Sequence, residues 1–316
     1  MKNYLRVFRY FLYGVLLSYG QSEMSLGEHL GYQKDTKLLI IHADDIGVSH
    51  AVNKASFAAF ESGAISSGSI MVPCPWLLEV VDFSKENPQF DLGLHLTLTA
   101  EWDQYKWDGV SSSNQIQSLL NERNHFYNNT ADVRKYADAE EVRSEIQAQI
   151  DYAKQLGIQP THLDSHMGAL SVRQDIAKVY LEVGEKNKIP VFLPKLLQPM
   201  VNLMDFDQKN LVWVERYYML DGNTLDRTKW PDFYYNVIDD LQPGLNVLLV
   251  HLGIDNEELQ AVTVNYPAFG ATWRALDLMV LESQEFKERL VQNKIEVIQW
   301  RDIKKHIYPM SNQSER

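Results

Sequence analysis

Residues 37–47 read KLLIIHADDIG, a short apolar run that ends in polar residues. A run of this kind is typical of a strand buried on both faces of a parallel sheet. Residues 49–62 follow with apolar side chains at helical spacing and stop at Gly63. The stretch therefore predicts a buried strand that leads directly into a helix.

The same alternation continues to the C-terminus. We predict further strands at 65–72, 92–98, 161–165, 190–193, 245–251 and 294–299, and helices at 76–86, 138–156, 173–187, 231–240 and 272–292. Repeated strand–helix units with apolar strands favour an α/β fold whose parallel sheet is closed or nearly closed into a barrel. Residues 100–137 interrupt the rhythm, as a functional loop or a disordered excursion does. With no visible repeat or firm boundary, we expect residues 37–316 to form one domain.

The N-terminus is typical of an export signal. Basic residues precede the apolar run 10–17, and small residues stand at positions 18 and 20. We expect residues 1–20 to be a signal peptide, residues 21–36 to be a linker, and the protein to be periplasmic or secreted. The alternative is an amphipathic or disordered terminus on a cytoplasmic protein. The apolar run is far shorter than a membrane span, and nothing else in the chain resembles one.

Composition narrows the range of partners. The 316 residues carry a formal net charge of −12, and the pI is near 5.2. Because phosphate contacts need clustered Lys and Arg, this balance argues against nucleic acid as the main partner. The single cysteine, Cys74, lies away from any Cys/His cluster, so we interpret it as a packing residue. The sequence leaves the oligomeric state open.

Polar residues collect at the C-terminal ends of four predicted strands, where parallel α/β folds build their sites. The residues are Asp44 and Asp45, His95 in GLHLTLT (93–99), three members of THLDSH (161–166), and His251. Each has a structural explanation when taken alone, since an acidic pair can cap a helix and a lone histidine can be a hydrogen-bonded core residue. Four such strand ends together predict a shared metal site.

The spacing within these motifs suggests a division of roles. At period two, His162, Asp164 and His166 face the same side of their strand, which favours a cation or a polar network over packing. Side chains alternate along a strand, so Asp44 and Asp45 point in different directions, and one can bind a metal while the other takes protons.

The same residue types indicate the chemistry. Asp and His ligands that leave open coordination positions are typical of a catalytic metal site. Nitrogen ligands favour zinc, cobalt, iron or manganese, whereas magnesium prefers oxygen. The chain has no Gly-rich phosphate loop, Gly-x-Ser-x-Gly elbow or Cys–His pair. Hydrolysis by metal-activated water is therefore the expected reaction.

The four motifs, in this order, resemble those of the YdjC-like carbohydrate deacetylase family. They read HADDIG (42–47), GLHLTLT (93–99), THLDSH (161–166) and VHLG (250–253), and the resemblance extends from about residue 37 to 300. It implies a distorted, incompletely closed (β/α) barrel of the polysaccharide-deacetylase type. It also implies hydrolysis of N-acetyl groups on an amino sugar or oligosaccharide, with one divalent metal ion that is Mg²⁺ in much of the family.

Residue roles follow from the resemblance by position. Asp45, His95 and His166 would be the metal ligands, Asp44 the general base and His251 the general acid. We further assign Asp164 to orienting a ligand or the base, and we interpret His162 as a core histidine.

Two features depart from the family pattern. Many members carry further histidines after the one that corresponds to His166, whereas this chain continues Met167-Gly168-Ala169-Leu170. His251 is followed by Leu252 where relatives usually have proline. The first departure bears on the substrate more than on the metal, and the second bears on the role of His251.

Aromatic residues could contact the sugar. Trp102 and Trp107 are the principal candidates for stacking on sugar rings, with Tyr217, Tyr218 and Trp230 as further ones. The alternative is that these side chains bury large areas and hold loops in place.

Two other functions remain open. One is a metal-dependent esterase or phosphodiesterase on the same barrel, but a phosphate substrate needs cationic side chains, and Lys195 and Arg216 are not clustered. The other is a sugar-binding protein without activity. The acidic pair argues against it, because a binding module needs no base beside a metal ligand.

Overall fold

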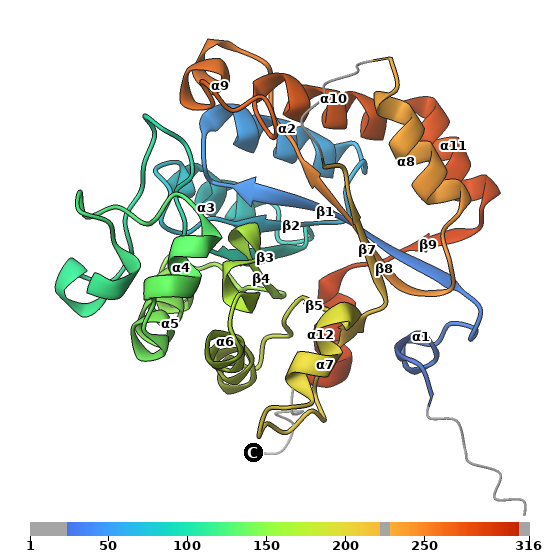
Figure 1. Ribbon diagram of the computed structural model, residues 1–316. Helices are drawn as coiled ribbons and strands as arrows, with labels where there is room; N and C mark the ends of the chain where they lie inside the picture. Colours follow the sequence, from blue (N-terminus) through green and yellow to red (C-terminus); the bar gives the residue numbers. More distant parts are fainter. Residues whose placement is uncertain (1–23, 222–227, 310–316) are drawn as a thin grey trace, which may run out of the picture.

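The computed structural model describes residues 24–221 and 228–309. A curled sheet of parallel strands forms its centre, in the order β4-β3-β2-β1-β8-β7, with β9 pairing with the start of β1 (Figure 1). The strands are β1 (Lys37–Ile46), β2 (Ser67–Ile70), β3 (Leu92–Leu96), β4 (Leu163–Ser165), β7 (Arg216–Met219), β8 (Gly244–His251) and β9 (Ile295–Val297).

Short pairings span the gap between the two edge strands, β4 and β7. A bridge between Leu163 and Val191 joins β4 to the segment before β5 (Leu193–Pro194), and β5 pairs with β6 (Trp213–Val214). Directly after β6, the Glu215 backbone N–H donates to the carbonyl of Leu245 in β8. The predicted α/β fold with an incompletely closed parallel barrel is confirmed.

Helices surround the outside of the sheet (Figure 1). The main ones are α2 (His50–Glu61), α3 (Leu77–Glu86), α5 (Ala139–Gln155), α6 (Gln174–Asn187), α8 (Trp230–Asp239), α10 (Ala271–Glu282) and α11 (Gln284–Gln292). The single helix predicted over 272–292 is therefore wrong. Ser283 ends α10 in an extended conformation, and its side chain accepts a hydrogen bond from the Phe286 N–H, so that it caps α11.

The sequence pattern missed several short elements. They are α1 (Leu26–His29), α4 (Thr130–Tyr136), α7 (Gln198–Val201), α9 (Glu257–Val262), α12 (Trp300–Ile307), β6, β7 and the 3₁₀ turns η1 (Ser113–Gln115), η2 (Gln117–Leu119), η3 (His166–Ser171) and η4 (Lys195–Leu197). Elements of two to eight residues show too few periods for an apolar pattern to stand out.

Successive inward-facing residues of β1 change from apolar to polar along the strand. Leu38 and Ile40 belong to an apolar cluster inside the curled sheet, which Trp300 and Ile303 of α12 close at the N-terminal end of the strands. Further along β1, the same face carries His42 and then Asp44, both buried. Along this face of β1, polar side chains therefore lie toward the C-terminal end of the strand.

The segment 100–137 is ordered and packed. The buried carboxylate of Glu145 in α5 accepts hydrogen bonds from the backbone N–H groups of Val110 (2.9 Å) and Ser111 (2.9 Å). Trp107 and Phe126 join the main core. Of the two alternatives, the structure therefore excludes a disordered excursion.

At the N-terminus, the predicted signal peptide lies outside the described residues. The predicted linker begins outside them too, but it includes α1, whose Ser25 cap forms reciprocal hydrogen bonds with Glu28. Leu26 and Leu30 pack against the inner apolar cluster. Within the two described ranges, no helix has both the length and the apolar character needed to cross a bilayer.

Candidate active site

Asp45 occupies an irregularity in β1 that turns its side chain toward the centre of the site. The pairing of β1 with β2 shifts between Ala43 and Ile46, and Asp45 has a φ of 67°. That left-handed conformation is uncommon for a residue with a side chain, although Asp tolerates it better than most. The expectation that Asp44 and Asp45 simply point apart is therefore wrong, because the irregularity brings both carboxylates to the same cavity.

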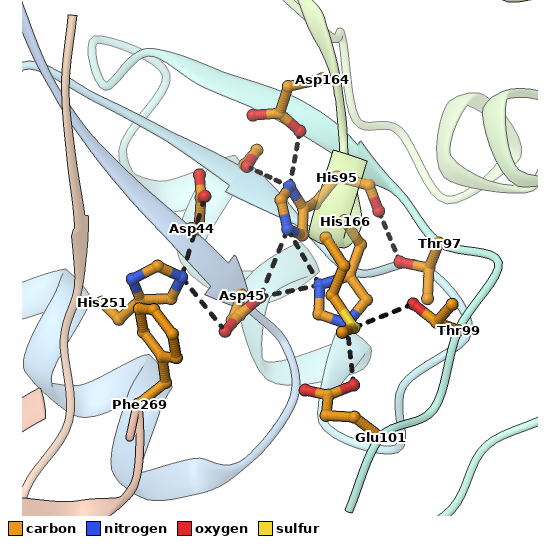
Figure 2. A network of polar contacts seen from close by, with 12 residues as sticks. Asp44, Asp45, His95, Thr97, Thr99, Glu101, Asp164, His166, His251 and Phe269 are labelled. Carbon is orange, nitrogen blue, oxygen red and sulfur yellow. Dashed lines mark hydrogen bonds and ion pairs between the residues drawn. The ribbon is translucent and has the colours of Figure 1, made fainter. Parts of the chain in front are cut away.

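Three side-chain atoms, one each from Asp45, His95 and His166, converge at the ends of three strands (Figure 2). Asp45 Oδ1 lies 3.3 Å from His95 Nε2 and 3.3 Å from His166 Nδ1. The two imidazole nitrogens lie 3.2 Å apart. All three side chains are buried, and together they form a group able to hold a metal ion.

Two further carboxylates orient these imidazoles. Asp164 Oδ1 accepts a hydrogen bond from His95 Nδ1 at 2.6 Å, which leaves Nε2 facing Asp45. Glu101 Oε2 lies 3.0 Å from His166 Nε2, which leaves Nδ1 facing Asp45. In its neutral form, each histidine would thus present a lone pair to the convergence point.

Negative charge dominates this region. Burial would raise the pKa of Asp45, but Arg274 and the imidazoles of His166 and His95 outweigh it and hold that pKa well below its usual range. Burial would lower the pKa of His166, but Glu101 and Asp45 outweigh it and raise the value to about 9. The carboxylates also raise the pKa of His95 above its usual range against burial. The site therefore favours a cation, either a proton or a metal ion.

His42 lies beneath this group, and no role was predicted for it from the sequence. Its Nε2 lies 2.8 Å from Asp164 Oδ2 and 3.2 Å from Asp44 Oδ1, so it connects the second carboxylate to the acidic pair. Burial would lower its pKa, but the hydrogen bonds to Asp164 and Asp44 outweigh burial and raise the pKa to about 9. The sequence does carry one signal for this residue: His42 lies two residues before Asp44, so the two side chains face the same side of the strand.

His162 separates this polar layer from the apolar closure below. Its ring contacts His42 edge-on at 4.9 Å and stacks on Trp300 at 5.2 Å between centroids. Burial is the main cause that lowers its pKa well below the usual range. This environment fits the interpretation of His162 as a neutral core histidine.

Asp44 and His251 face each other across the β1–β8 pair. They are register partners, and His251 Nε2 lies 3.9 Å from Asp44 Oδ2 and 4.0 Å from Asp45 Oδ2 (Figure 2). Burial is the main cause that lowers the pKa of His251 to about 4, with Arg274 contributing and Asp45 opposing. His251 is therefore neutral near pH 7.

Helix α10 supplies two site residues that were not predicted from the sequence. Arg274 Nη2 donates to Asp45 Oδ2 at 2.6 Å, and its Nε donates to the Phe269 carbonyl at 2.6 Å. Asp277, one turn later, accepts the His251 backbone N–H at 3.1 Å and the Trp230 indole N–H at 2.9 Å. Burial raises the pKa of Asp277 to about 7 despite these hydrogen bonds. No motif marks either residue, since a helix that follows a site by some twenty residues shows only its own apolar pattern.

A cavity of about 590 Å³ opens over the group. Asp44, Asp45, His95, His166 and His251 line it, together with Glu101, Trp102 and Arg274. All five residues predicted to bind metal or carry protons are thus brought together.

Of the aromatic residues predicted to contact the sugar, some line the cavity and others do not. Trp102 and Tyr217 line the cavity, although Trp102 is itself buried. Trp107 does not line it, is buried in the core and donates its indole N–H to the Thr99 carbonyl at 2.9 Å. The prediction that Trp107 stacks on a sugar is therefore replaced by a packing role. Trp230 is also buried, where it holds Asp277.

The cationic residues considered for a phosphate substrate lie elsewhere. Lys195 pairs with Glu215 at 2.6 Å on the surface, and Arg216 is exposed on β7. Neither lines the cavity. Arg274 does line it, but two of its nitrogens are already hydrogen-bonded.

The ligand atoms fit one divalent ion. Two atoms each about 2.1 Å from one cation are roughly 3.0 to 3.4 Å apart at octahedral or tetrahedral angles. The three measured separations of 3.2 and 3.3 Å lie within that range. In addition, Asp45 Oδ1 is buried and makes no hydrogen bond with good geometry among the described residues.

Comparison with known proteins places the chain in a family. The YdjC-like protein family model matches residues 38–292. The chain belongs to the YdjC-like family. Within it, a carbohydrate deacetylase of Thermus thermophilus is 30% identical over 290 residues, which cover 90% of this chain and 100% of the relative. A carbohydrate deacetylase of Clostridium beijerinckii is 26% identical over 84% of this chain and 99% of the relative.

A solved structure supports the fold of this YdjC-like protein. It is a candidate cellobiose-phosphate cleavage protein of Enterococcus faecalis, which superposes with a TM-score of 0.70 at 22% identity. The superposition covers 84% of this chain and 98% of the other. At this identity the likeness supports the fold alone.

Proposed function

We propose that this protein is a metal-dependent carbohydrate deacetylase that hydrolyses N-acetyl groups on an amino sugar or oligosaccharide. The convergence of Asp45, His95 and His166 beside a second carboxylate, Asp44, is the observation that carries the proposal. YdjC-like relatives named carbohydrate deacetylases supply the substrate class.

Asp45, His95 and His166 would hold the metal ion. When bound, a divalent ion supplies a Lewis acid that polarises the acetyl carbonyl and lowers the pKa of water. The ligand set suits zinc or another transition metal, and family resemblance suggests Mg²⁺. Asp164 and Glu101 fix the two imidazoles, and Arg274 fixes the free oxygen of Asp45.

Asp44 serves as the general base. It takes a proton from the water that attacks the acetyl carbonyl carbon. The C–N bond then breaks, acetate leaves, and the amine nitrogen gains a proton. The net reaction consumes one water and gives acetate and a free amino sugar.

His251 completes the proton path. A neutral imidazole is too weak an acid to protonate the amine, so His251 must first gain a proton, and Asp44, 3.9 Å away, holds the one taken from the water. We therefore assign His251 to carrying that proton from Asp44 to the departing amine. Asp277 holds the backbone of His251 in place for this step.

Acetate release from N-acetylated chito-oligosaccharides tests the proposal. We expect release that stops with EDTA and returns when divalent metal is restored. Asp44→Asn should lose at least a hundredfold in kcat and keep its metal, whereas Asp45→Asn should lose both. Asp103→Asn is the matched control, since Asp103 is an exposed acid that contacts Asn265 and Tyr266 at the cavity margin.

Three outcomes would contradict the proposal. Full turnover in Asp44→Asn would show that Asp44 is not the general base. Normal metal content in Asp45→Asn would show that Asp45 is not a metal ligand. Absence of acetate from all sugars, with metal restored, would favour an esterase, a phosphodiesterase or a sugar-binding protein without activity.

A further inference from the structure

The two oxygens of the Asp44 carboxylate have different surroundings. Oδ1 is buried and lies 3.2 Å from His42 Nε2, whereas Oδ2 lies 3.9 Å from His251 Nε2. Among residues 24–221 and 228–309, these two histidines are the ion-pair partners of Asp44, and Oδ1 makes no hydrogen bond of good geometry. The position of this carboxylate therefore depends on His42 more than on any other side chain.

His42 is itself held at both ring nitrogens. It lies opposite Ser67 in the β1–β2 pair, and its Nδ1 is 3.1 Å from the Ser67 hydroxyl oxygen. Burial raises the pKa of Asp91, and a hydrogen bond from Ser67 opposes that rise, so the Ser67 hydroxyl donates to Asp91 and can accept from Nδ1–H. On its other side, His42 Nε2–H donates to Asp164 Oδ2 at 2.8 Å. His42 thus donates from both nitrogens, as an imidazolium does.

Asp164 connects this imidazolium to the proposed metal ligands. Its Oδ2 accepts from His42, while its Oδ1 accepts from His95 Nδ1 at 2.6 Å. The Ser69 hydroxyl lies between the same two rings, 3.2 Å from His42 Nε2 and 3.2 Å from His95 Nδ1. A chain of buried polar contacts therefore runs from His95 through Asp164 and His42 to Asp44. Such a network rigidifies the groups that it joins.

We propose that His42 is a positioning residue that fixes Asp44 through Oδ1 and leaves Oδ2 as the oxygen that takes the proton from water. Asp44 lines the cavity and its Oδ1 is buried, so Oδ2 is the oxygen that water can reach. Oδ2 is also the oxygen nearer to His251, which receives the proton next. This inference rests on the proposed deacetylase function and adds a residue to its machinery.

Steady-state kinetics on N-acetylated chito-oligosaccharides test this role. His42→Leu removes both donors, and we expect kcat to fall about tenfold to a hundredfold, with KM within about twofold and normal metal content, because a misplaced base slows the reaction more than it weakens binding. His42→Gln should stay within about threefold of wild type, since its amide NH₂ can donate near the position of Nε2.

His162→Leu is the matched control. His162 is also a buried histidine, and its ring contacts that of His42, but it has no contact with Asp44 among the described residues. We expect its kcat to stay within about twofold of wild type. An unchanged kcat in His42→Leu, or equal losses in the two leucine variants, would overturn the proposal.

A double variant distinguishes positioning from a general loss of structure. If His42 acts through Asp44, His42→Leu should have no further effect on kcat once Asp44→Asn has removed the base, because residues that act on one step are not additive. A further loss as large as that of His42→Leu alone would show that His42 stabilises the fold and not the base, and would contradict the proposal.

Crystal structures separate this inference from the proposed function. We expect Asp44 to keep Oδ1 against residue 42 in wild type and His42→Gln, and to change rotamer in His42→Leu. An unmoved Asp44 in His42→Leu would refute the positioning role even if wild type released acetate. A displaced Asp44 in His42→Leu, with no acetate released by wild type from any sugar, would support the positioning role and refute the deacetylase.

Discussion

At the scale of single residues, carboxylates do more than bind a cation. Asp45 faces the convergence point, whereas Asp164 and Glu101 each fix the imidazole of one histidine from behind. The role of each carboxylate cannot be inferred from its position along the chain. Asp164 lies two residues from His166 in sequence, but it orients His95. What decides the role is which nitrogen each carboxylate meets.

Glu101 offers a direct test of this positioning role. Glu101→Ala removes the acceptor for His166 Nε2–H, which frees the ring to rotate and to change tautomer. We expect metal affinity to fall about 10- to 100-fold, with a smaller loss in Glu101→Gln because the amide oxygen still accepts. Isothermal titration with the metal checks this, and Asp103→Ala is the control. Unchanged affinity in Glu101→Ala would show that Glu101 does not position the ligand.

His42 predicts a dependence of stability on pH in metal-free protein. Its pKa is raised to about 9 in the folded state, so its contribution is complete below the unfolded value of about 6.5 and is lost as pH rises through about 9. We expect the unfolding free energy in EDTA to fall between pH 6.5 and 9 by on the order of 3 kcal/mol more than in His42→Gln. Urea unfolding across that range measures the difference. Parallel profiles for the two proteins would contradict a charged His42 between Asp164 and Asp44.

At the scale of elements, α10 links the two halves of the site. Arg274 and Asp277 lie one turn apart on the same face of the helix. Arg274 binds the carboxylate of Asp45, and Asp277 binds the backbone of His251 at the end of β8. A shift of α10 would therefore move a metal-binding residue and the proton carrier together. The helix also packs beside α8 and α11 in Figure 1, which holds it against the barrel.

Arg274 is the residue through which α10 stabilises the site. Arg274→Met leaves Asp45 buried without its cationic partner, and removing one member of a buried pair costs about 3–5 kcal/mol. We expect that loss in chemical unfolding in EDTA, whereas Arg216→Met should stay within about 0.5 kcal/mol because Arg216 is exposed. A loss in Arg274→Met no larger than in the control would mean that this pair does not stabilise the folded state.

The strand ends were predictable and the supporting residues were not. Asp44, Asp45, His95, His166 and His251 stand out because ionisable residues interrupt apolar strands, and parallel strands bring their ends to one edge. Arg274 and Asp277 stand on an amphipathic helix, where a charged residue is unremarkable until tertiary packing buries it. The irregularity at Asp45 was likewise invisible, since strand periodicity assumes regular pairing.

At the scale of the whole molecule, the barrel interior has an apolar and a polar end. Trp300 and Ile303 close the end from which the strands start, and His162 marks the transition to the buried acids and imidazoles. A polar cluster this deep is costly without a compensating cation. The incomplete closure between β4 and β7 leaves the segment around β5 to line the cavity instead of forming a barrel strand.

Metal binding should therefore stabilise the entire fold. A ligand that binds only the folded state adds about 2.7 kcal/mol at a concentration of 100 times its Kd. For a chain of this size we expect the melting temperature to rise by roughly 4 °C at that concentration, and Asp45→Asn, which removes a ligand from the cluster, should show no rise. Calorimetry with metal added after EDTA treatment measures both proteins, with Asp103→Asn as the control that keeps the full shift. An equal rise in wild type and Asp45→Asn would place the stabilising metal somewhere other than at Asp45, His95 and His166.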